Sequence, residues 1–289
     1  MTASEKSVLV TGATGFIGRS LTRALASRGW NVTTLSRGNC PENINNHCRI
    51  DLDDCFALQD LNKTGPYGAI VHLAARIGLE ESNDRDMMIP NVVSTGILAN
   101  YAREWNADYI FASTALVHGS KSKYISKNTP IMPDIPYAKT KWIAEEIIRS
   151  LLPTHTILRM GGVFGYEGPS HLGINRAIRS AMGGGNLQIS GSGKALRNYI
   201  YVEDVARIIC DILGKRITGT YLLGGSQILS IQEMLEIIAN RFLPGYVPEK
   251  VGSEETSDQI VECSYGHAET RSFIDAVDDI FKLMPSSNK

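Results

Sequence analysis

The chain has 289 residues, enough for one large α/β domain or for a large domain with a small partner. With a formal net charge of -1 and 43% hydrophobic residues, neither a nucleic acid polymer nor an anionic membrane is an expected partner. The apolar runs are strand-sized, shorter than the roughly 20 residues of a membrane span. The polar first residues do not resemble a signal peptide. Five cysteines without C-x-x-C spacing favour a reducing cytoplasm and no metal site.

Strands and helices alternate along the first half of the chain. Short apolar runs predict the strands, and apolar residues at helical spacing predict the helices between them. This alternation is typical of a parallel, doubly wound sheet with right-handed crossovers. The expected strands are 7–11, 31–36, 69–74, 108–113 and 155–159, and the expected helices are 16–28, 53–61, 92–104 and 137–151.

The pattern changes after Gly161, where glycine-rich turns become frequent. Helical spacing returns at 174–182, 203–213, 231–242 and 268–281. We expect the large sheet domain to cover residues 1–164, with residues 198–223 returning to it. Residues 165–197 and 224–289 then form a smaller, partly interleaved C-terminal lobe.

The first predicted strand ends in a glycine-rich turn formed by Gly12, Gly15 and Gly18. Without β-carbons the backbone can turn tightly and approach a pyrophosphate, and the following helix offers free N–H groups. The spacing is G-x-x-G-x-x-G, which differs from the G-x-G-x-x-G of ordinary dinucleotide dehydrogenases. A dinucleotide site is the favoured interpretation, and a strand-to-helix turn without a ligand is the alternative.

The end of the second strand carries Ser36 and Arg37 where an acidic residue would favour NAD. A guanidinium can pair with a 2′-phosphate, so NADP(H) is the preferred cofactor and NAD(H) remains possible. Arg37 as a simple exposed loop residue is the alternative. Asp51 and Leu52, after the next short strand, border either the adenine or only a solvated turn.

A tyrosine and a lysine lie four residues apart on the helix predicted over 137–151. Tyr137 and Lys141 therefore share one face of it, and Pro136 is suited to start the helix. We expect the lysine ammonium to lower the pKa of the phenol, so that Tyr137 exchanges a proton with a carbinol or carbonyl oxygen. Thr114, at a strand end, is expected to hold that oxygen, and Ser113 is its competitor. Since Y-x-x-x-K also arises by chance, the glycine turn upstream is what makes the pair informative.

The motifs combine into a pattern that spans nearly the whole chain. It includes residues 11–18, Asp51-Leu52, residues 71–75, Asn91, Ser113-Thr114, Pro136-Tyr137 with Lys141, residues 159–165 and residues 191–204. The chain thereby resembles the extended short-chain dehydrogenase/reductase superfamily, in its branch of NAD(P)-dependent nucleotide-sugar epimerases, dehydratases and ketoreductases. The resemblance implies a Rossmann-type sheet, a nucleotide-sugar substrate, and a homodimer formed through the helices at 92–104 and 137–151.

The resemblance also implies roles for individual residues. Thr114, Tyr137 and Lys141 would carry catalysis, and Arg197 would reach the substrate diphosphate, with a surface ion pair as its alternative. Arg76, Thr114, His118 and Asn175 are further candidates for the substrate, although His118 could equally well only pack. The cofactor candidates are Gly12, Thr14, Gly15, Phe16, Ile17, Gly18, Arg37, Asp51, Leu52, Leu73, Ala74, Ala75, Asn91, Tyr137 and Lys141.

Departures from the family pattern limit which of the family's reactions we expect. Ala115 and Leu116 stand where the sugar dehydratases carry Asp-Glu, so no acid and base are present there for the loss of water. Gly162 and Asn198 replace a usual asparagine and aspartate. The leading hypothesis is an NADPH-dependent reductase of a nucleotide-linked 4-keto-6-deoxysugar. A 4-epimerase with tightly bound NAD, a non-catalytic NAD(P)-sensing protein and a reductase of non-sugar carbonyls are the alternatives.

Overall fold

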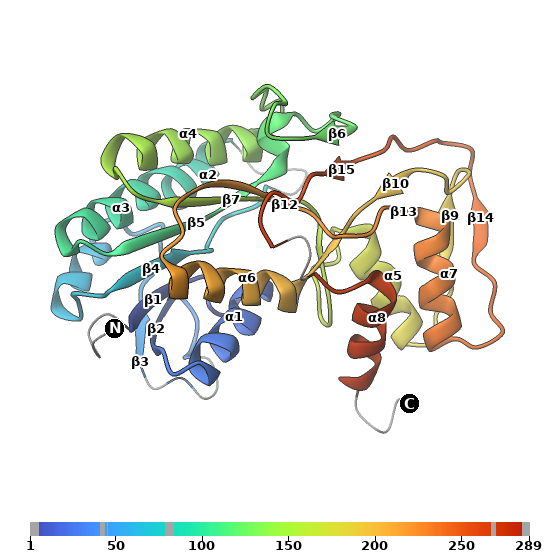
Figure 1. Cartoon of the computed structure of the whole chain (residues 1–289), viewed down its shortest axis with the longest axis horizontal. Coiled ribbons are helices and arrows are strands. Elements are labelled where there is room, and N and C mark those ends of the chain that lie inside the picture. The colour runs from blue at the N-terminus through green and yellow to red at the C-terminus, as the bar shows by residue number, and fades with distance from the viewer. Residues whose placement is uncertain (1–5, 41–43, 45, 79–83, 267–269, 285–289) are drawn as a thin grey trace. The chain divides into compact units, whose positions relative to one another are not determined.

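The central sheet joins seven strands whose order reverses once (Figure 1). The five strands from β1 to β5 pair in parallel, and β1 lies between β2 and β4. This is the doubly wound order, so the predicted Rossmann-type fold class is confirmed. Across the sheet the strands are β12 (Gly219–Leu223), β7 (Thr156–Met160), β5 (Asp108–Thr114), β4 (Ala69–His72), β1 (Ser7–Thr11), β2 (Asn31–Ser36) and β3 (Asn46–Arg49).

Helices cover both faces of this sheet (Figure 1). One face carries α1 (Phe16–Ser27) and α6 (Val202–Lys215), and the other carries α3 (Ser94–Trp105) and α4 (Pro136–Leu151). The core beneath α3 and α4 contains Leu98, Phe111, Ala144 and Ile148, all with 0% exposure. Burial of these side chains holds α4 against β5.

The computed structural model describes residues 6–40, 44, 46–78, 84–266 and 270–284. The chain divides into two compact units. The first comprises Met1–Ser120, Pro130–Arg159 and Val205–Tyr221, and the second comprises Lys121–Thr129, Met160–Asp204 and Leu222–Lys289. The boundaries predicted from sequence remain a proposal. None of the described helices has the length and apolarity to cross a bilayer.

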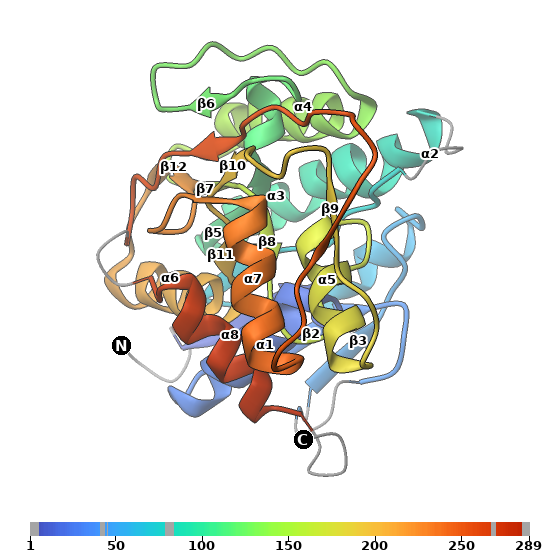
Figure 2. The same ribbon diagram turned by 90° about the vertical axis from the view of Figure 1, so that its right-hand side faces the viewer.

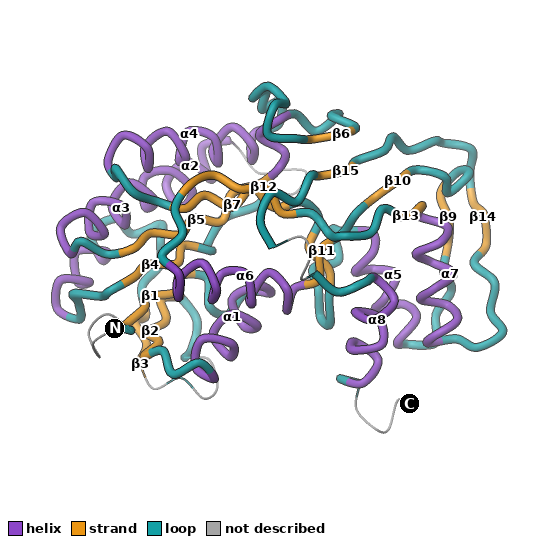
Figure 3. The backbone as a smooth tube through the Cα atoms, in the orientation of Figure 1, coloured by secondary structure: helices purple, strands orange, loops and turns teal. Residues whose placement is uncertain are grey.

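Among its described residues, the second unit contains three helices and pairs of very short strands (Figures 2 and 3). Helix α7 (Ile231–Phe242) packs against both α5 (Gly173–Met182) and α8 (Phe273–Lys282). Ser230 and Glu233 form a capping box that starts α7, as their spacing favours. The strand pairs are β6 (Tyr124–Ile125) with β15 (Ile260–Val261), β8 (Val163–Phe164) with β11 (Ile200–Tyr201), β9 (Gln188–Ser190) with β14 (Glu249–Val251), and β10 (Leu196–Arg197) with β13 (Leu229–Ser230).

Three predicted helices differ from the structure. The segment predicted over 53–61 is the 3-10 helix η1 (Ala57–Lys63), because the Asp54 carboxylate first accepts bonds from the amides of Phe56 and Ala57. The helix predicted over 92–104 is preceded by α2 (Asp84–Met88) and the π-helical turn η2 (Ile89–Val93). The last helix begins at Phe273 and not at 268, because Ser272 caps it. Residues 268 and 269 lie outside the described part of the chain.

Asn198 joins three backbone segments of the second unit. Its amide donates to the carbonyls of Gly225 and Val261 at 3.0 and 2.7 Å, and its oxygen accepts from the Val261 amide at 2.9 Å. Asn198 is buried. The asparagine fits here because a carboxylate has no N–H to offer the two carbonyls.

We expect Asn198→Asp to lower the free energy of unfolding by about 2 kcal/mol or more, because two buried carbonyls lose their donors. Urea denaturation followed by circular dichroism measures this change. Asn186→Asp, at an exposed position, is the matched control and should stay within about 0.5 kcal/mol of the parent protein. Equal stabilities for the two variants would contradict the proposed clamp.

Candidate functional site

A pocket of about 470 Å³ lies at the carboxyl edge of the central sheet, within the first unit. The segments that follow β1, β2, β3 and β4 all contribute to its wall. Doubly wound sheets bind ligands at this edge, where the strand order reverses. The predicted site residues that line it are Gly12, Thr14, Gly15, Arg37, Asp51, Leu52, Leu73, Ala74, Ala75 and Arg76.

The glycine turn brings the backbones of β1 and β4 close together. Gly12 has φ +68, and a Cβ there would lie 2.7 Å from the amide nitrogen of Ala74. A Cβ at Gly18 would lie 2.2 Å from the carbonyl oxygen of Gly12. Gly15 is the N-cap of α1 and no side chain caps this terminus, which leaves its first N–H groups for an anion. Phe16, Ile17 and Gly18 form the first turn of that helix, behind the pocket wall.

Two buried polar atoms of the pocket wall have no hydrogen-bond partner among the described residues. They are Oγ of Ser36 and Oδ1 of Asp53. The other oxygen of Asp53 accepts from the guanidinium of Arg76, which also lines the pocket. Because buried polar groups are nearly always satisfied, these atoms suit a ligand that carries hydroxyl or amino groups. Together with the glycine turn and the helix terminus, they fit the adenosine pyrophosphate part of a dinucleotide.

Tyr137 and Lys141 lie on successive turns of α4. Lys141 is 1% exposed, and its ammonium lies 4.1 Å from the centre of the Phe111 ring. Burial lowers the pKa of Lys141 to about 7, although the charge of Glu145 acts to raise it. Thr114 ends β5, and its hydroxyl accepts from the Leu116 amide at 3.2 Å.

The expected lowering of the Tyr137 pKa is not found. Burial raises the pKa of Tyr137 to about 12. The physical reason is that Lys141 shares the same apolar surroundings and itself loses charge near neutral pH. Tyr137 is therefore a neutral phenol at pH 7, a proton donor in its resting state.

Asn91 lies behind the pocket wall, and its side chain binds the Arg76 backbone and the Thr140 hydroxyl. Its side chain exchanges hydrogen bonds with the amide and carbonyl of Arg76 at 2.7 and 2.9 Å, and it donates to Thr140 at 3.1 Å. Thr140 in turn donates to the carbonyl oxygen of Tyr137 at 2.8 Å. Asn91 is 1% exposed. The contacts made by this predicted cofactor residue thus connect the pocket to the first turn of α4.

The other substrate candidates lie in both units. His118, in the first unit, is 3% exposed and contacts the Arg159 guanidinium and the Pro130 carbonyl. Asn175 and Arg197 belong to the second unit. Asn175 binds the backbone of Gly165 and Val163, and Arg197 donates to the carbonyls of Leu196 and Ser257. Their predicted contacts with substrate remain predictions.

The glycine at position 162 has a local structural cause in the second unit. A Cβ there would lie 2.4 Å from Cδ1 of Tyr199, so the tyrosine ring occupies the space of a larger side chain. Burial raises the pKa of the Tyr199 phenol, and the neighbouring Arg197 acts to lower it. The Tyr199 ring therefore explains why glycine stands at position 162, where the family usually has asparagine.

Sequence reasoning did not assign several residues of the site. Ser36 is the last residue of β2 and precedes the assigned Arg37, and Asp53 follows the assigned Leu52. Their position near a strand end was the available signal. Glu145 lies one further helical turn beyond Lys141, but its partners come from distant segments. The remaining unassigned residues of the pocket wall are Leu35, Ile50, Ile77 and Pro90. No cluster of three or more His, Cys, Asp or Glu side chains suited to a metal occurs in the described ranges.

The fold and the pocket define a Rossmann-type α/β protein with a site at the carboxyl edge of its sheet. Residues 8–224 match the model of the NAD dependent epimerase/dehydratase family, and the chain belongs to that family. Its relatives are nucleotide-sugar epimerases and dehydratases of the extended short-chain dehydrogenase/reductase superfamily, as the motifs predicted.

Individual relatives cover most of the chain. The UDP-glucose 4-epimerase 4 of Oryza sativa subsp. japonica is 27% identical, over 87% of this chain and 82% of its own. The dTDP-glucose 4,6-dehydratase of Escherichia coli is 26% identical, over 88% and 81%. The crystal structure of the UDP-N-acetylglucosamine 4-epimerase from Bacillus cereus is similar with a TM-score of 0.81 and 25% identity, over 97% and 99% of the two chains.

We expect Gly12→Ala to weaken dinucleotide binding at least about tenfold, because the methyl group meets the Ala74 backbone and pushes the turn out of shape. Gly29→Ala is the matched control. Gly29 also has a positive φ of +75, but nothing lies within 4 Å of its Cβ position. Isothermal titration with NADPH and NADH measures both variants. Equal affinities would show that the close approach at Gly12 is unrelated to binding.

Proposed function

We propose that this protein is an NADP(H)-dependent reductase of a nucleotide-linked 4-keto sugar, with a 4-keto-6-deoxysugar as the preferred substrate. The observation that carries the proposal is the Tyr137–Lys141 pair on α4, in which the tyrosine is held as a neutral phenol. The family supplies the substrate class, since its members in the comparisons act on nucleotide sugars.

The proposed reduction needs a hydride at the carbonyl carbon and a proton at the carbonyl oxygen. A bound nicotinamide dinucleotide supplies the hydride. Thr114 would hold the substrate oxygen through its hydroxyl, while Tyr137 donates the phenolic proton to that oxygen as the carbinol forms. The Lys141 ammonium would stabilise the phenolate that remains, and would be available to the cofactor ribose.

The resting protonation state favours reduction as the starting direction. Because burial raises the pKa of Tyr137 to about 12, the phenol is neutral at pH 7. An enzyme that begins by oxidising a carbinol needs the phenolate as a base, whereas a reductase begins with the neutral phenol. Elimination of water has no support here, since Ala115 and Leu116 offer neither acid nor base.

Arg37 is the basis for the NADP(H) proposal. It is exposed and lines the pocket directly after β2, where a 2′-phosphate would be recognised. The negative charge of Asp53 on the same wall is balanced by its pair with Arg76. Arg37 is therefore the cation left to meet an additional phosphate at the ribose.

A nucleotide-sugar 4-epimerase is the second candidate. The observation that favours it is the similarity to the 4-epimerases of Oryza sativa and Bacillus cereus. An epimerase would retain NAD and return the hydride to the opposite face of the same sugar. Mass spectrometry of the nucleotide that copurifies distinguishes the two, because retained NAD favours the epimerase.

A homodimer in the cytoplasm is part of the same proposal. Val93 of η2 and Ile143 of α4 are apolar side chains that are 42% and 39% exposed, as suits contact with a second copy of the chain. The five cysteines without C-x-x-C spacing support the cytoplasm as the proposed compartment.

We expect the purified protein to consume NADPH with at least one sugar from a panel of nucleotide-linked 4-keto sugars. Tyr137→Phe should lower kcat about 100-fold or more, because the proton donor is lost, with little change in dinucleotide affinity. Tyr124→Phe, at a 58% exposed position, is the control. Absence of NADPH consumption together with interconversion of UDP-hexoses would overturn the reductase in favour of the epimerase.

We expect Arg37→Ser to weaken NADPH binding about 10- to 100-fold while NADH binding stays nearly constant, since only NADPH carries the 2′-phosphate. Arg103→Ser, an exposed arginine in the last turn of α3, controls for a general loss of positive charge. Dinucleotide titrations at two salt concentrations measure the effect. Equal losses for NADPH and NADH would contradict the assignment of Arg37.

A further inference from the structure

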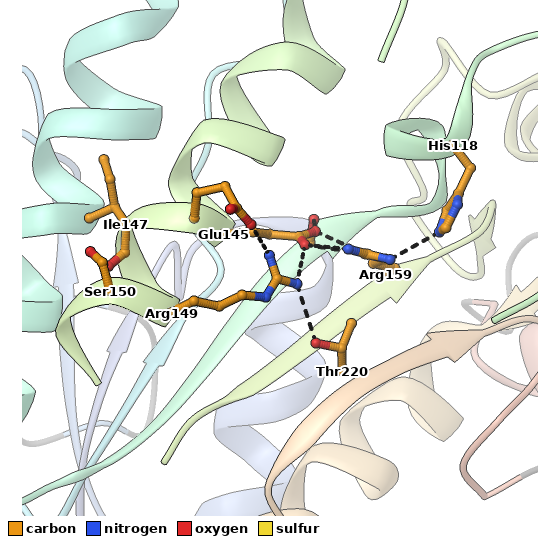
Figure 4. Close-up of polar contacts among 9 residues, drawn as sticks. His118, Glu145, Ile147, Arg149, Ser150, Arg159 and Thr220 are labelled. Atoms are coloured by element: carbon orange, nitrogen blue, oxygen red, sulfur yellow. Dashed lines mark hydrogen bonds and ion pairs between the residues drawn. The ribbon is translucent and has the colours of Figure 1, made fainter. Parts of the chain in front are cut away.

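Glu145 is a fully buried carboxylate for which the proposed reaction gives no role. It is 0% exposed and lies on α4, one turn beyond Lys141. Figure 4 shows that arginines from two elements converge on it. Arg159 of β7 donates through Nε and Nη2 at 3.1 and 2.7 Å, and Arg149 of α4 donates at 2.8 Å. These contacts keep the Glu145 pKa below its usual value against the opposing effect of burial.

The first connection from Glu145 to the proposed chemistry is electrostatic. Lys141 is buried against the Phe111 ring, and the Glu145 charge counteracts the loss of its ammonium. The other titratable groups that face Lys141 among the described residues are Tyr137, one turn earlier on α4, and His72 of β4. Burial lowers the pKa of His72 to about 3, with a smaller contribution from Lys141, so His72 stays neutral at working pH. Glu145 is thus the anion that acts on Lys141.

The second connection is a hydrogen bond to the end of β5. The Ser113 hydroxyl donates to Oε1 of Glu145 at 2.5 Å, and Ser113 directly precedes Thr114. Glu145 therefore ties the backbone beside the proposed substrate-oxygen holder to the helix that carries Tyr137 and Lys141. Three proposed catalytic side chains depend on two elements that this one carboxylate joins.

The hydrogen bonds that start at Glu145 continue through Arg159 to His118. Arg159 Nη1 lies 3.1 Å from Nε2 of His118, and Nδ1 of His118 lies 3.2 Å from the Pro130 carbonyl (Figure 4). A guanidinium can only donate, so Nε2 accepts and Nδ1 carries the proton. The Arg159 guanidinium therefore donates to both His118 and Glu145, and these bonds fix it beside the Glu145 carboxylate.

We propose that Glu145 is a positioning residue for the redox reaction: its buried carboxylate fixes Ser113 beside Thr114 and lies one helical turn from Lys141. This inference rests on the proposed function, since it assigns Glu145 a task toward the Thr114, Tyr137 and Lys141 set. A buried ion pair alone is weak ground for stability, so the network needs a test that separates positioning from folding.

The first test compares Glu145→Gln with Glu146→Gln. Glu146 is the neighbouring residue on α4, pairs with the same Arg149, and has a 54% exposed side chain. Loss of the Glu145 charge lowers the pKa of Lys141, so the ammonium disappears at lower pH. The alkaline decline of kcat should move down by about one pH unit or more in Glu145→Gln, and Glu146→Gln should keep the parent profile.

Arg149→Met should shift the alkaline decline of kcat in the opposite direction, to higher pH. The Arg149 side chain is 29% exposed, and Arg159 still pairs with Glu145 when Arg149 is replaced. With one cation fewer near Glu145, the anion acts more strongly on Lys141, and the alkaline decline should move up. A merely structural network would change the rate or the melting temperature without moving the profiles in opposite directions. If Glu145→Gln does not fold, Arg149→Met decides alone.

The pH dependence of NADPH binding gives a measurement that needs no sugar. Tryptophan fluorescence quenching should show the same two shifts in the dinucleotide Kd. If these shifts occur but no keto sugar is reduced, the proposed function fails and the positioning role stands. If the parent enzyme reduces a keto sugar and all variants share its pH profiles, the positioning role is overturned.

Discussion

The site depends on one buried chain of hydrogen bonds that begins at the pocket wall. The Ala74 amide donates to Thr11, and Thr11 lies 2.6 Å from Nδ1 of His72. Nε2 of His72 lies 2.9 Å from Thr95, which itself donates to the Asn91 carbonyl. Since the Thr95 hydroxyl is already used as a donor, His72 must donate from Nε2 and accept at Nδ1. Only a neutral imidazole can do this, in agreement with its pKa of about 3.

The same chain continues into the helix of the proposed proton donor. The Asn91 side chain binds the backbone of Arg76 in both directions and donates to Thr140, which donates to the Tyr137 carbonyl. These hydrogen bonds therefore fix the segment after β4 to the first turn of α4. Because every donor in the chain has one acceptor, shifting the pocket wall would require breaking bonds at the base of Tyr137 as well.

The parts of this arrangement that were predictable from the sequence are those encoded by neighbouring residues. The bounds of β2 and α7 agree with their apolar periodicity, and the i, i+4 spacing correctly placed Tyr137 and Lys141 on one helix. Two-residue strands such as β8 and β11 have no period to detect. Glu145 and Asn198 were also inaccessible, because their partners lie up to 32 and 63 residues away, and a buried charge looks like a surface charge until those partners are known.

The proposed reduction depends on which charged groups are stable beside α4. The apolar surroundings of Tyr137 and Lys141 disfavour both the phenolate and the ammonium, which leaves a neutral phenol ready to donate. Reduction creates the phenolate at the moment when the adjacent lysine can be protonated, and the Glu145 charge makes that protonation easier. An epimerase of the same sequence would need Tyr137 first as a base and then as an acid at the same sugar oxygen. In the proposed reductase the first proton transfer goes to the sugar, so the reaction starts from Tyr137 in its neutral form.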